Sequence, residues 1–409
     1  MFAERRHSHR RADKASSKRW KHVVKLLCIH QGYELYGSDR SFIESVHALR
    51  SAFPDAEIDV VLPREGPIAD YLRDDATRVI FEPLWVLRKH SLVRLATIDL
   101  ARLPLALLRA WKRTRDADIV YINTSVVFDY TLVSRLFPDK VILHAHEIPE
   151  GFALRIIRRL LRWSKAELIF NSQATKRAFP DLADRRSHVI YNGVAIPAEL
   201  EPIAPRPEGP FKILMLGRIN RIKGQEVLVD AVTALPQAFR ERVSVRIVGS
   251  AFGSDAPYLA LQDRIAEAGL ETCVALMPFV ADPTEHFRWA DIVVVPSRMP
   301  ESLGRVAIEA MAFGRPAVVS AIGGLAEIVD DGHTGWLVPP GDASALSARL
   351  QAFMADPRPL PEFARAGRQR YEQMFNPAVV ATAIGRVFRE KLARRQTGLQ
   401  PRPGEVRAK

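Results

Sequence analysis

Two series of short apolar runs, separated by a proline-rich stretch, limit most strongly how this chain can fold. The first series includes VVKLLCIH (23–30), IVYINTS (119–125) and KVILHAH (140–146), with helix-like segments between several runs. Continuous apolar runs that alternate with helical patterns are typical of a parallel sheet covered on both faces. We therefore predict one α/β domain over residues 22–200.

The stretch EPIAPRPEGP (201–210) has the composition of a linker, and the alternating pattern restarts after it. The second series includes FKILMLGRI (211–219), DIVVVPS (291–297) and PAVVSA (316–321), which predicts a second α/β domain over 211–376. A helix over 377–395 is predicted to pack back on the first domain. Residues 1–21 and 396–409 are predicted to be disordered tails. The expected fold is two Rossmann-like domains that face each other across a ligand-binding cleft.

Charge and cysteine content indicate which ligands and which cellular compartment suit the protein. The formal net charge of the 409 residues is +12, and most of the excess lies in the first half of the chain, where it would attract phosphates of any kind. Cys28 and Cys273 both lie in apolar runs, which predicts buried thiols rather than a disulfide. The longest apolar neighbourhood, 92–111, is broken by charges and a proline. We expect a cytoplasmic protein, with possible peripheral contact on the cytoplasmic face of the inner membrane.

The stretch PESLGRVAIEAMAFGRPA (300–317) places two acids around a predicted helix over 306–313. N–H groups near Ser302, Leu303 and Gly304 would suit a diphosphate at the start of that helix. Glu309 lies five residues further on, about 7–8 Å along the axis, which matches the step from a diphosphate to a ribose. A capping or surface acid is the alternative. Because apolar residues surround Glu309 and Arg305 belongs to the first turn, we expect a ligand to be its partner.

Three further loops follow predicted strands. Gly217 ends one strand, and Arg218 and Lys223 then bracket a loop that could clamp a phosphate or could carry ordinary surface charges. Gly37 and Ser38 could turn backbone N–H groups toward the cleft, although a plain connecting loop explains them nearly as well. LHAHEIPEG (143–151) carries two histidines and two acids, but a metal site is disfavoured because no third ligand cluster is evident.

Several blocks together resemble glycosyltransferase family 4, a group of retaining sugar transferases of GT-B architecture. The resemblance covers roughly residues 22–390 and rests on GRINRIKGQEVLVDAV, ADIVVVPS, ESLGRVAIEAMAFGRPAVVSAIGGLAEIVDDGHTGWLVPPGD, NSQATKRAF and VIYNGV. The chain departs from the common family pattern at two places. It has Glu301-Ser302-Leu303-Gly304 where an aromatic residue often precedes the glycine, and YGSD where paired glycines are commoner.

The resemblance implies a role for each matching position. It implies that Arg218 and Lys223 neutralise the donor diphosphate, that Glu301 contacts the donor sugar, and that Glu309 holds the ribose. The N–H groups of Ser302, Leu303 and Gly304 would face the phosphate, with Gly217 nearby. The remaining implied positions are His146 near the sugar and acceptor, Gly37 and Ser38 beside the diphosphate, and Phe279 and Val280 beside the nucleobase.

The implied reaction is hexosyl transfer from a UDP- or GDP-linked sugar to a saccharide or lipid-linked acceptor, in polysaccharide, lipopolysaccharide or glycolipid biosynthesis. No cofactor and no metal are expected if the two cations and the helix N-terminus stabilise the leaving group. We favour front-face transfer, because no nucleophile is evident. The basic segment RIIRRLLRWSKAE (155–167) either contacts anionic lipid headgroups or forms a solvated helix face.

Three other functions remain open at this point. A sugar-nucleotide epimerase of the same architecture would differ by forming an epimerised product without an acceptor. A nucleic-acid- or anion-binding protein would explain the positive charge, but no reader module is visible, and we do not expect nucleic acid as a partner. A sugar-binding homologue without activity is disfavoured because both glutamates and both cations are present.

Overall fold

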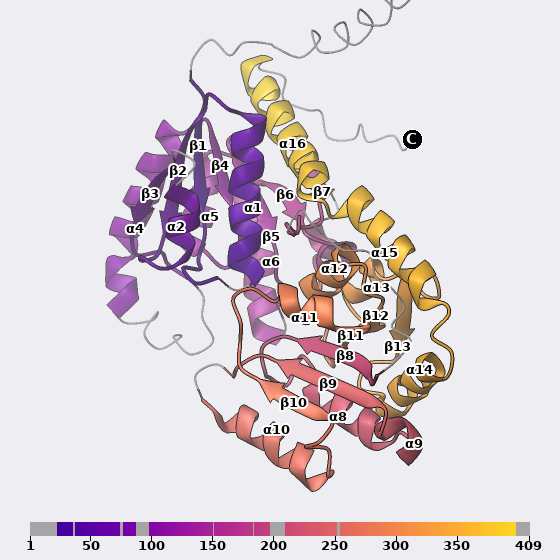
Figure 1. Cartoon of the computed structure of the whole chain (residues 1–409). Helices are drawn as coiled ribbons and strands as arrows, with labels where there is room; N and C mark the ends of the chain where they lie inside the picture. The colour runs from indigo at the N-terminus through magenta and orange to yellow at the C-terminus, as the bar shows by residue number, and fades with distance from the viewer. Residues whose placement is uncertain are drawn as a thin grey trace, which may run out of the picture.

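The structure is a computed structural model that describes residues 23–35, 37–73, 77–86, 98–149, 151–182, 184–196, 209–251 and 254–397. Two parallel sheets, each with helices on both faces, lie one above the other in Figure 1. The predicted tail over 1–21 and most of the predicted linker and C-terminal tail lie outside the described residues. No helix within the described ranges combines the length and apolarity needed to cross a membrane.

The first sheet has seven strands in the order β3-β2-β1-β4-β5-β6-β7. The strands are β1 (Lys25–Ile29), β2 (Glu57–Leu62), β3 (Arg78–Phe81), β4 (Ile119–Ile122), β5 (Val141–Ala145), β6 (Glu167–Phe170) and β7 (Ser187–Val189). The connecting helices are α1 (Gly37–Ala52), α2 (Ile68–Arg73), α4 (Ile98–Asp116), α5 (Phe128–Val133), α6 (Gly151–Ser164) and α7 (Gln173–Arg177), with short 3-10 helices η1 (Ser134–Leu136) and η2 (Pro180–Leu182). Strand order reverses at β1, so a ligand crevice is expected beside the loop that follows it.

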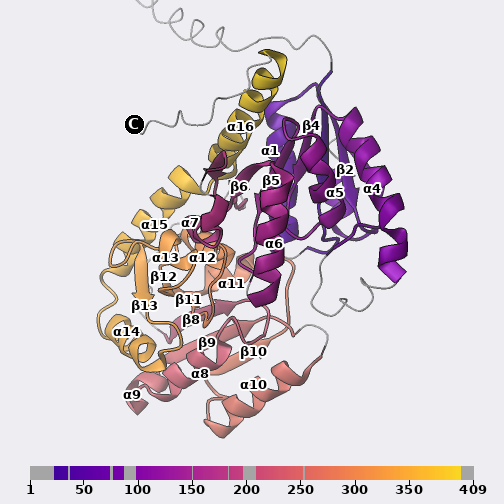
Figure 2. The same ribbon diagram turned by 180° about the vertical axis from the view of Figure 1, so that it is seen from behind.

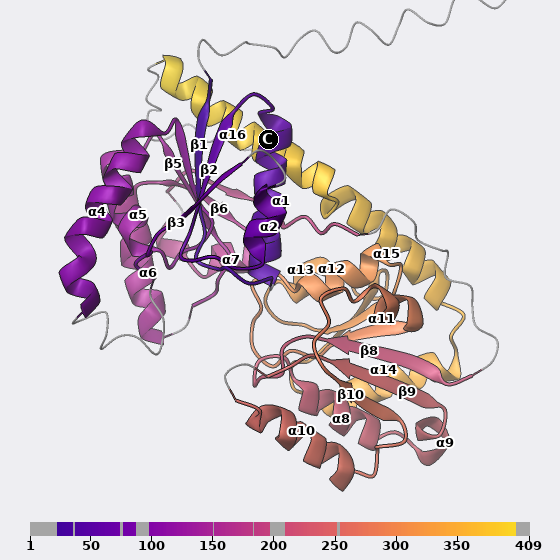
Figure 3. The same ribbon diagram turned by 60° about the vertical axis from the view of Figure 1, so that its left-hand side comes forward.

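Side chains of β1 show why its sequence is apolar throughout. Leu26 and Cys28 point to the core shared with α1 and α2, whereas Leu27 and Ile29 point to the core shared with α4, α5 and α6. Figure 3 shows these two helical layers on opposite sides of the sheet. The Cys28 thiol is buried, which raises its pKa, while Cys273 is half-buried rather than buried as predicted; both thiols are free.

The second sheet has six strands in the order β10-β9-β8-β11-β12-β13. The strands are β8 (Phe211–Leu216), β9 (Val243–Val248), β10 (Val274–Met277), β11 (Ile292–Val295), β12 (Ala317–Ser320) and β13 (Gly335–Val338). Its helices are α8 (Gln225–Thr233), α9 (Gln237–Arg240), α10 (Ala256–Glu267), α11 (Thr284–Trp289), α12 (Arg305–Ala312), α13 (Leu325–Ile328), α14 (Ala343–Ala355) and α15 (Leu360–Met374). The predicted fold, a Rossmann-like α/β arrangement in each half of the chain, is therefore confirmed.

Helix α16 (Pro377–Thr397) leaves the second half and lies against α1 of the first (Figure 1). It ends two residues later than the predicted helix. Val380, Ile384 and Phe388 belong to the same buried core as β1 and α1. Gly385 permits the close approach, because a Cβ atom at that position would lie 2.7 Å from Ala52 Cβ. The last helix thus completes the core of the first half.

Candidate functional site

A cavity of about 400 Å³ lies between the two halves, at the carboxyl ends of their strands. The residues predicted as site residues all line it: Gly37, Ser38, His146, Gly217, Arg218, Lys223, Phe279, Val280, Glu301, Ser302, Leu303, Gly304 and Glu309. The structure therefore brings these predicted residues together, although they come from seven separate segments of the chain.

The loop between β11 and α12 supplies one wall of the cavity. Gly304 caps α12 with φ of 89°, a left-handed conformation that favours glycine, and a Cβ atom there would lie 2.3 Å from Leu325 Cδ2. Within the described part of the chain, the backbone N–H groups of Ser302, Leu303 and Gly304 donate to no protein acceptor. An eight-residue helix that begins beside three unused N–H groups can accept an anion in this cavity.

Glu301 and Lys223 form an ion pair across the same wall. Lys223 Nζ lies 2.6 Å from Glu301 Oε2, and their side chains are 23% and 11% exposed. Ser297 donates from its hydroxyl to the other carboxylate oxygen of Glu301. The lysine reaches the cavity from the turn before α8, where Gly224 has φ of 75°. These contacts fix the orientation of one ammonium and one carboxylate on the same wall of the cavity.

Glu309 has a protein partner, which corrects the sequence prediction. Arg305 donates from Nε to Glu309 Oε1 at 2.9 Å, although we expected no basic residue of α12 to be placed for this contact. The prediction failed because Arg305, as the first residue of α12, stands one full turn before Glu309 on the same helix face. The Glu309 side chain remains 13% exposed and lines the cavity, so it can still meet a ligand.

The remaining wall of the second half carries Arg218 and the segment 279–281. Arg218 is exposed, and its carbonyl accepts from Gln225 Nε2 at 3.0 Å. The Phe279 ring is about half exposed, and the Phe279 N–H donates to Ser250 Oγ at 3.0 Å. An exposed aromatic ring at the mouth of a cavity offers a flat surface for a planar ligand group.

His146 lies on the wall contributed by the first half, above a buried chain of polar side chains. His146 Nε2 lies 2.7 Å from Asn123 Oδ1, and Asn123 Nδ2 lies 3.3 Å from His30 Nδ1. His30 Nε2 lies 2.9 Å from Asp39 Oδ1. Because the Asn123 amide nitrogen can only donate, this geometry assigns the proton of His30 to Nε2 and the proton of His146 to Nε2.

The protonation of the two neighbouring histidines follows from their burial. Burial lowers the pKa of His146 well below its usual range, and the nearby His144 and His30 add to that effect. Burial alone lowers the pKa of His144 to about 3, and its Nδ1 lies 2.6 Å from Tyr121 OH. The His146 Nδ1 atom has no hydrogen-bond partner among the described residues. A neutral His146 therefore presents a lone pair at Nδ1.

Several hydrogen bonds join the two halves beside the cavity and further from it. Arg40 of α1 donates to the carbonyl of Ala281, and Asn171 Nδ2 lies 3.3 Å from Ser302 Oγ. A further contact joins α13 to α7: Glu327 accepts from the N–H groups at the start of α7, where Gln173 N lies 2.8 Å from Glu327 Oε2. Figure 2 shows α7 and α13 next to each other. Hydrogen bonds from the backbone and from side chains thus join the two halves that form the cavity.

Sequence reasoning missed several polar residues of this region. The cavity is also lined by Arg40, Ser41, Asn171, Asn192, Asn220, Ser250 and Arg305. Asn123 and Asn171 each follow a buried strand directly, β4 and β6, and polar residues at the carboxyl ends of parallel strands belong near a ligand. That signal was available in the sequence. Within the described residues, no three His, Cys, Asp or Glu side chains gather in a way that could hold a metal ion.

Two sheets with a cavity between their carboxyl ends define the GT-B fold. Solved structures of glycosyltransferases share it. HepE of Anabaena in complex with UDP superposes with a TM-score of 0.74 at 24% identity, over 90% of this chain and 100% of that one. A glycosyltransferase of Rickettsia africae superposes with a TM-score of 0.72 at 19% identity, over 90% of this chain and 99% of that one.

Sequence comparison identifies the family. The model of "Glycosyltransferase Family 4" matches residues 37–196, and the model of "Glycosyl transferases group 1" matches residues 198–370. The two models match adjacent parts of the chain, one in each half. The chain therefore belongs to the glycosyltransferases that these models describe, as the resemblance predicted.

Curated relatives match over part of their length. Glycogen synthase of Mycobacterium tuberculosis is 35% identical over 239 residues, which cover 57% of this chain and 54% of the relative. D-inositol 3-phosphate glycosyltransferase of an Arthrobacter species is 38% identical over 162 residues, which cover 39% of this chain and 38% of the relative. The chain thus spans about half, or less, of the length of these curated relatives.

Proposed function

We propose that the chain is a retaining glycosyltransferase that moves a hexose from a nucleotide-diphosphate sugar to a saccharide or lipid-linked acceptor. The observation that carries this proposal is the order of groups in one cavity. Phe279 and Val280 would border the base and Glu309 would hold the ribose. The N–H groups of residues 302–304 would bind the diphosphate, with the sugar near Glu301 and His146. HepE, which shares the fold, was solved with UDP and with UDP-glucose.

The cations of the cavity would act on the leaving group. Departure of a nucleoside diphosphate develops negative charge on its phosphate oxygens, and Arg218, Lys223 and the start of α12 would stabilise that charge. Lys223 is already oriented by Glu301, so little reorganisation is needed when the donor binds. We propose that these groups serve in place of a metal ion and that no cofactor takes part.

The proposed transfer proceeds on one face of the sugar. The bond between the anomeric carbon and the diphosphate oxygen breaks, and the acceptor oxygen forms its bond to that carbon from the same side. The proton of the acceptor hydroxyl passes to the departing phosphate oxygen, so atoms and charges balance. A glycosyl-enzyme trapped in single-turnover mass spectrometry would contradict this step.

The acceptor would approach along the first half of the chain. Helix α6 exposes Phe152 and Trp163, and the guanidinium of Arg135 lies over the Trp163 ring at 4.5 Å. Arg158 pairs with Asp181 at 2.6 Å, so this arginine is partly neutralised. Exposed aromatic rings beside basic residues support contact with an anionic membrane that carries a lipid-linked acceptor. We include cell-surface polysaccharide or glycolipid assembly in this proposal.

Donor binding is the first test. The wild-type protein should be stabilised against heat by one class among UDP-, GDP-, ADP- and dTDP-sugars, and should slowly hydrolyse that donor with retention at the anomeric carbon. Glu309→Ala should lose the stabilisation. Glu285→Ala, which changes an acid that is 81% exposed on α11, should keep it. Absence of stabilisation by every donor would overturn the proposal, and an epimerised sugar would favour the epimerase.

Membrane contact needs a separate measurement. The protein should co-sediment with vesicles that contain phosphatidylglycerol, and binding should weaken as salt rises. Replacing Phe152 and Trp163 by serine should abolish sedimentation without changing donor hydrolysis. Sedimentation that is absent, or independent of salt, would contradict this part of the proposal.

A further inference from the structure

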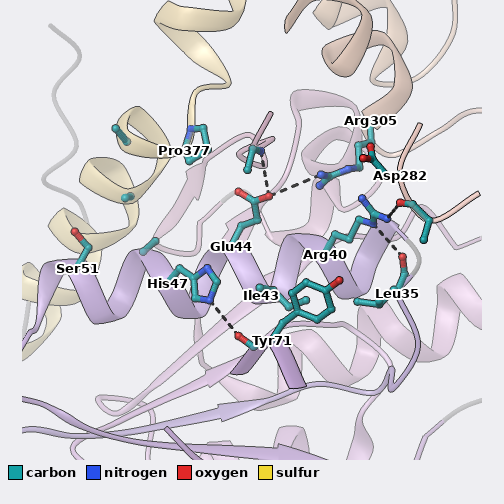
Figure 4. Close-up of a pocket in the computed structure, with 15 residues that line it drawn as sticks. Leu35, Arg40, Ile43, Glu44, His47, Ser51, Tyr71, Asp282, Arg305 and Pro377 are labelled. Carbon is teal, nitrogen blue, oxygen red and sulfur yellow. Dashed lines mark hydrogen bonds and ion pairs between the residues drawn. The ribbon is translucent and has the colours of Figure 1, made fainter. Parts of the chain in front are cut away.

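Arg305 lies between two carboxylates that come from different halves of the molecule. Its Nε donates to Glu309 Oε1 at 2.9 Å, and its Nη2 lies 3.8 Å from Glu44 Oε1 on α1. The three side chains are only 13–16% exposed. Figure 4 shows Glu44 directed at Arg305 in a second cavity, of about 590 Å³, which adjoins the donor cavity and shares Arg305 with it.

Glu44 is held in place on its own side. Its Oε1 accepts from the N–H of Ala195 at 3.1 Å, in the segment where the chain leaves the first half. Burial raises the pKa of Glu44, and the positive charge of Arg305 opposes that effect more than any other neighbour does. The carboxylate of Glu44 is therefore oriented by backbone and depends on Arg305 for electrostatic support.

The way in which Arg305 contacts Glu309 leaves part of that carboxylate unused. A guanidinium carries Nε and Nη2 in a planar fork that matches both oxygens of a carboxylate, and such pairs are frequently bidentate. Here Arg305 donates to Glu309 only from Nε to Oε1, while Nη2 is turned toward Glu44. No described residue donates to Glu309 Oε2. That oxygen is available for a ligand hydroxyl.

We propose that Glu44 is a positioning residue for the ribose site, which it controls through Arg305. By attracting Nη2, Glu44 prevents the guanidinium from closing its fork on Glu309, and the free carboxylate oxygen can then accept a ribose hydroxyl. The inference rests on the proposed function, because it takes Glu309 to be the ribose ligand. It adds that a residue of the first half sets how the second half recognises the sugar of the nucleotide.

The contact between Glu44 and Arg305 also makes ribose binding depend on how the two halves are arranged. Glu44 can act on Arg305 only while α1 and α12 stay at their present distance. A Cβ atom at Gly37 would lie 3.8 Å from Arg305 Cδ, so the start of α1 also packs beside the arginine side chain. Separation of the halves frees the fork to engage both oxygens of Glu309, and ribose recognition then weakens.

Discrimination between ribose and deoxyribose tests this role directly. Dissociation constants are measured by calorimetry for UDP, GDP and ADP, each beside its 2′-deoxy counterpart. Wild-type protein should prefer the ribonucleotide by about tenfold or more, as expected for one hydrogen bond to a charged group. In Glu44→Gln that preference should fall to about threefold or less, because the closed fork competes with the hydroxyl. A purely structural role would weaken both nucleotides equally.

Two further variants separate this effect from general damage. Glu327→Gln removes another acid that joins the halves but does not touch Arg305, and it should leave the ribose preference unchanged. Arg305→Lys replaces the fork by a single ammonium, and adding Glu44→Gln to that background should change the preference by less than about twofold. If Glu44→Gln does not fold, Glu44→Asp should still give an intermediate preference.

Three results would overturn the inference. Glu44→Gln with the wild-type preference would show that Glu44 does not act on the ribose, while the transferase proposal would stand. Wild-type protein that binds a ribonucleotide and its 2′-deoxy counterpart equally would also remove the inference about Glu44 and leave the transferase proposal standing. Wild-type protein that binds none of these nucleotides would remove the proposed function and the inference with it.

Discussion

Replacement of Glu167 should release helix α16 from the first half of the molecule in a pH-dependent way. Glu167 opens β6 and is 4% exposed at its side chain, where it meets three basic groups. His188 Nε2 lies 2.9 Å from Oε1, while Lys391 Nζ and Arg394 Nη2 of α16 lie 3.3 and 2.6 Å from Oε2. Glu167→Gln keeps the shape of the side chain and removes the charge that holds these two α16 residues.

The magnitude follows from the pKa of Glu167. Burial alone would raise this pKa, but the hydrogen bond from His188 and the charges of Lys391 and Arg394 together lower it to about 2 from 4.5. A carboxyl whose folded pKa is depressed contributes stability above its unfolded pKa and loses it as pH falls. The expected contribution is about 3 kcal/mol at pH 7 and falls to about 1 kcal/mol at pH 3.

Urea unfolding of both proteins at several pH values measures this contribution. The free energy of unfolding of Glu167→Gln should lie about 3 kcal/mol below that of the wild type at pH 7, and the gap should shrink by more than half at pH 3. Glu390→Gln is the matched control on α16, since Glu390 is half exposed and 3.8 Å from Arg394, and should cost less than about 1 kcal/mol. A gap that stays constant with pH, or that is below about 1 kcal/mol at pH 7, would refute the reasoning.

Further predictions concern the donor cavity. Lys223→Met should lower the kcat of donor hydrolysis about 30-fold, because a cation about 4 Å from a half-developed charge contributes about 2 kcal/mol; a change confined to KM in steady-state kinetics would contradict this. Gly304→Ala should lower stability by about 1–3 kcal/mol, because its φ of 89° is strained for alanine and Leu325 blocks the Cβ; calorimetry with an unchanged Tm would contradict this. Asn123→Ala should shift the tautomer of His146 in nitrogen NMR spectra and lower kcat, whereas an unchanged Nε2–H tautomer would contradict the assigned hydrogen-bond chain.

The fold could be predicted because local sequence determines it. Runs such as IVYI and IVVV are apolar on both faces, and the glycine and proline after Phe313 end a helix, so strands and helix ends could be placed from short windows. Both motif acids could be found as well, since their spacing and their apolar surroundings are visible along the chain. The family resemblance then assigned each residue an expected role.

Other parts of the site depend on contacts between distant segments. Glu44 and Arg305 lie 261 positions apart in the chain, and no local pattern marks them as neighbours. The spacing of four between Arg305 and Glu309 is typical of an ion pair on one helix face, although the apolar residues around Glu309 favoured a ligand as its partner. The hydrogen-bond chain from Asp39 to His146 joins a residue of α1 to residues that directly follow β1, β4 and β5, so its order required the positions of those strands in the sheet.

Placement of α16 has a consequence for how the protein matures. The hydrophobic core beside β1 and α1 includes Val380, Ile384 and Phe388, which are synthesised after the whole second half. Domains of a growing chain generally fold as units, beginning with the N-terminal one. Here the first half must leave the ribosome with part of its apolar surface uncovered, and it stays exposed to chaperones and to aggregation until the last helix arrives. The core residues of the second half end at Phe375, so that half is complete before α16 has been synthesised.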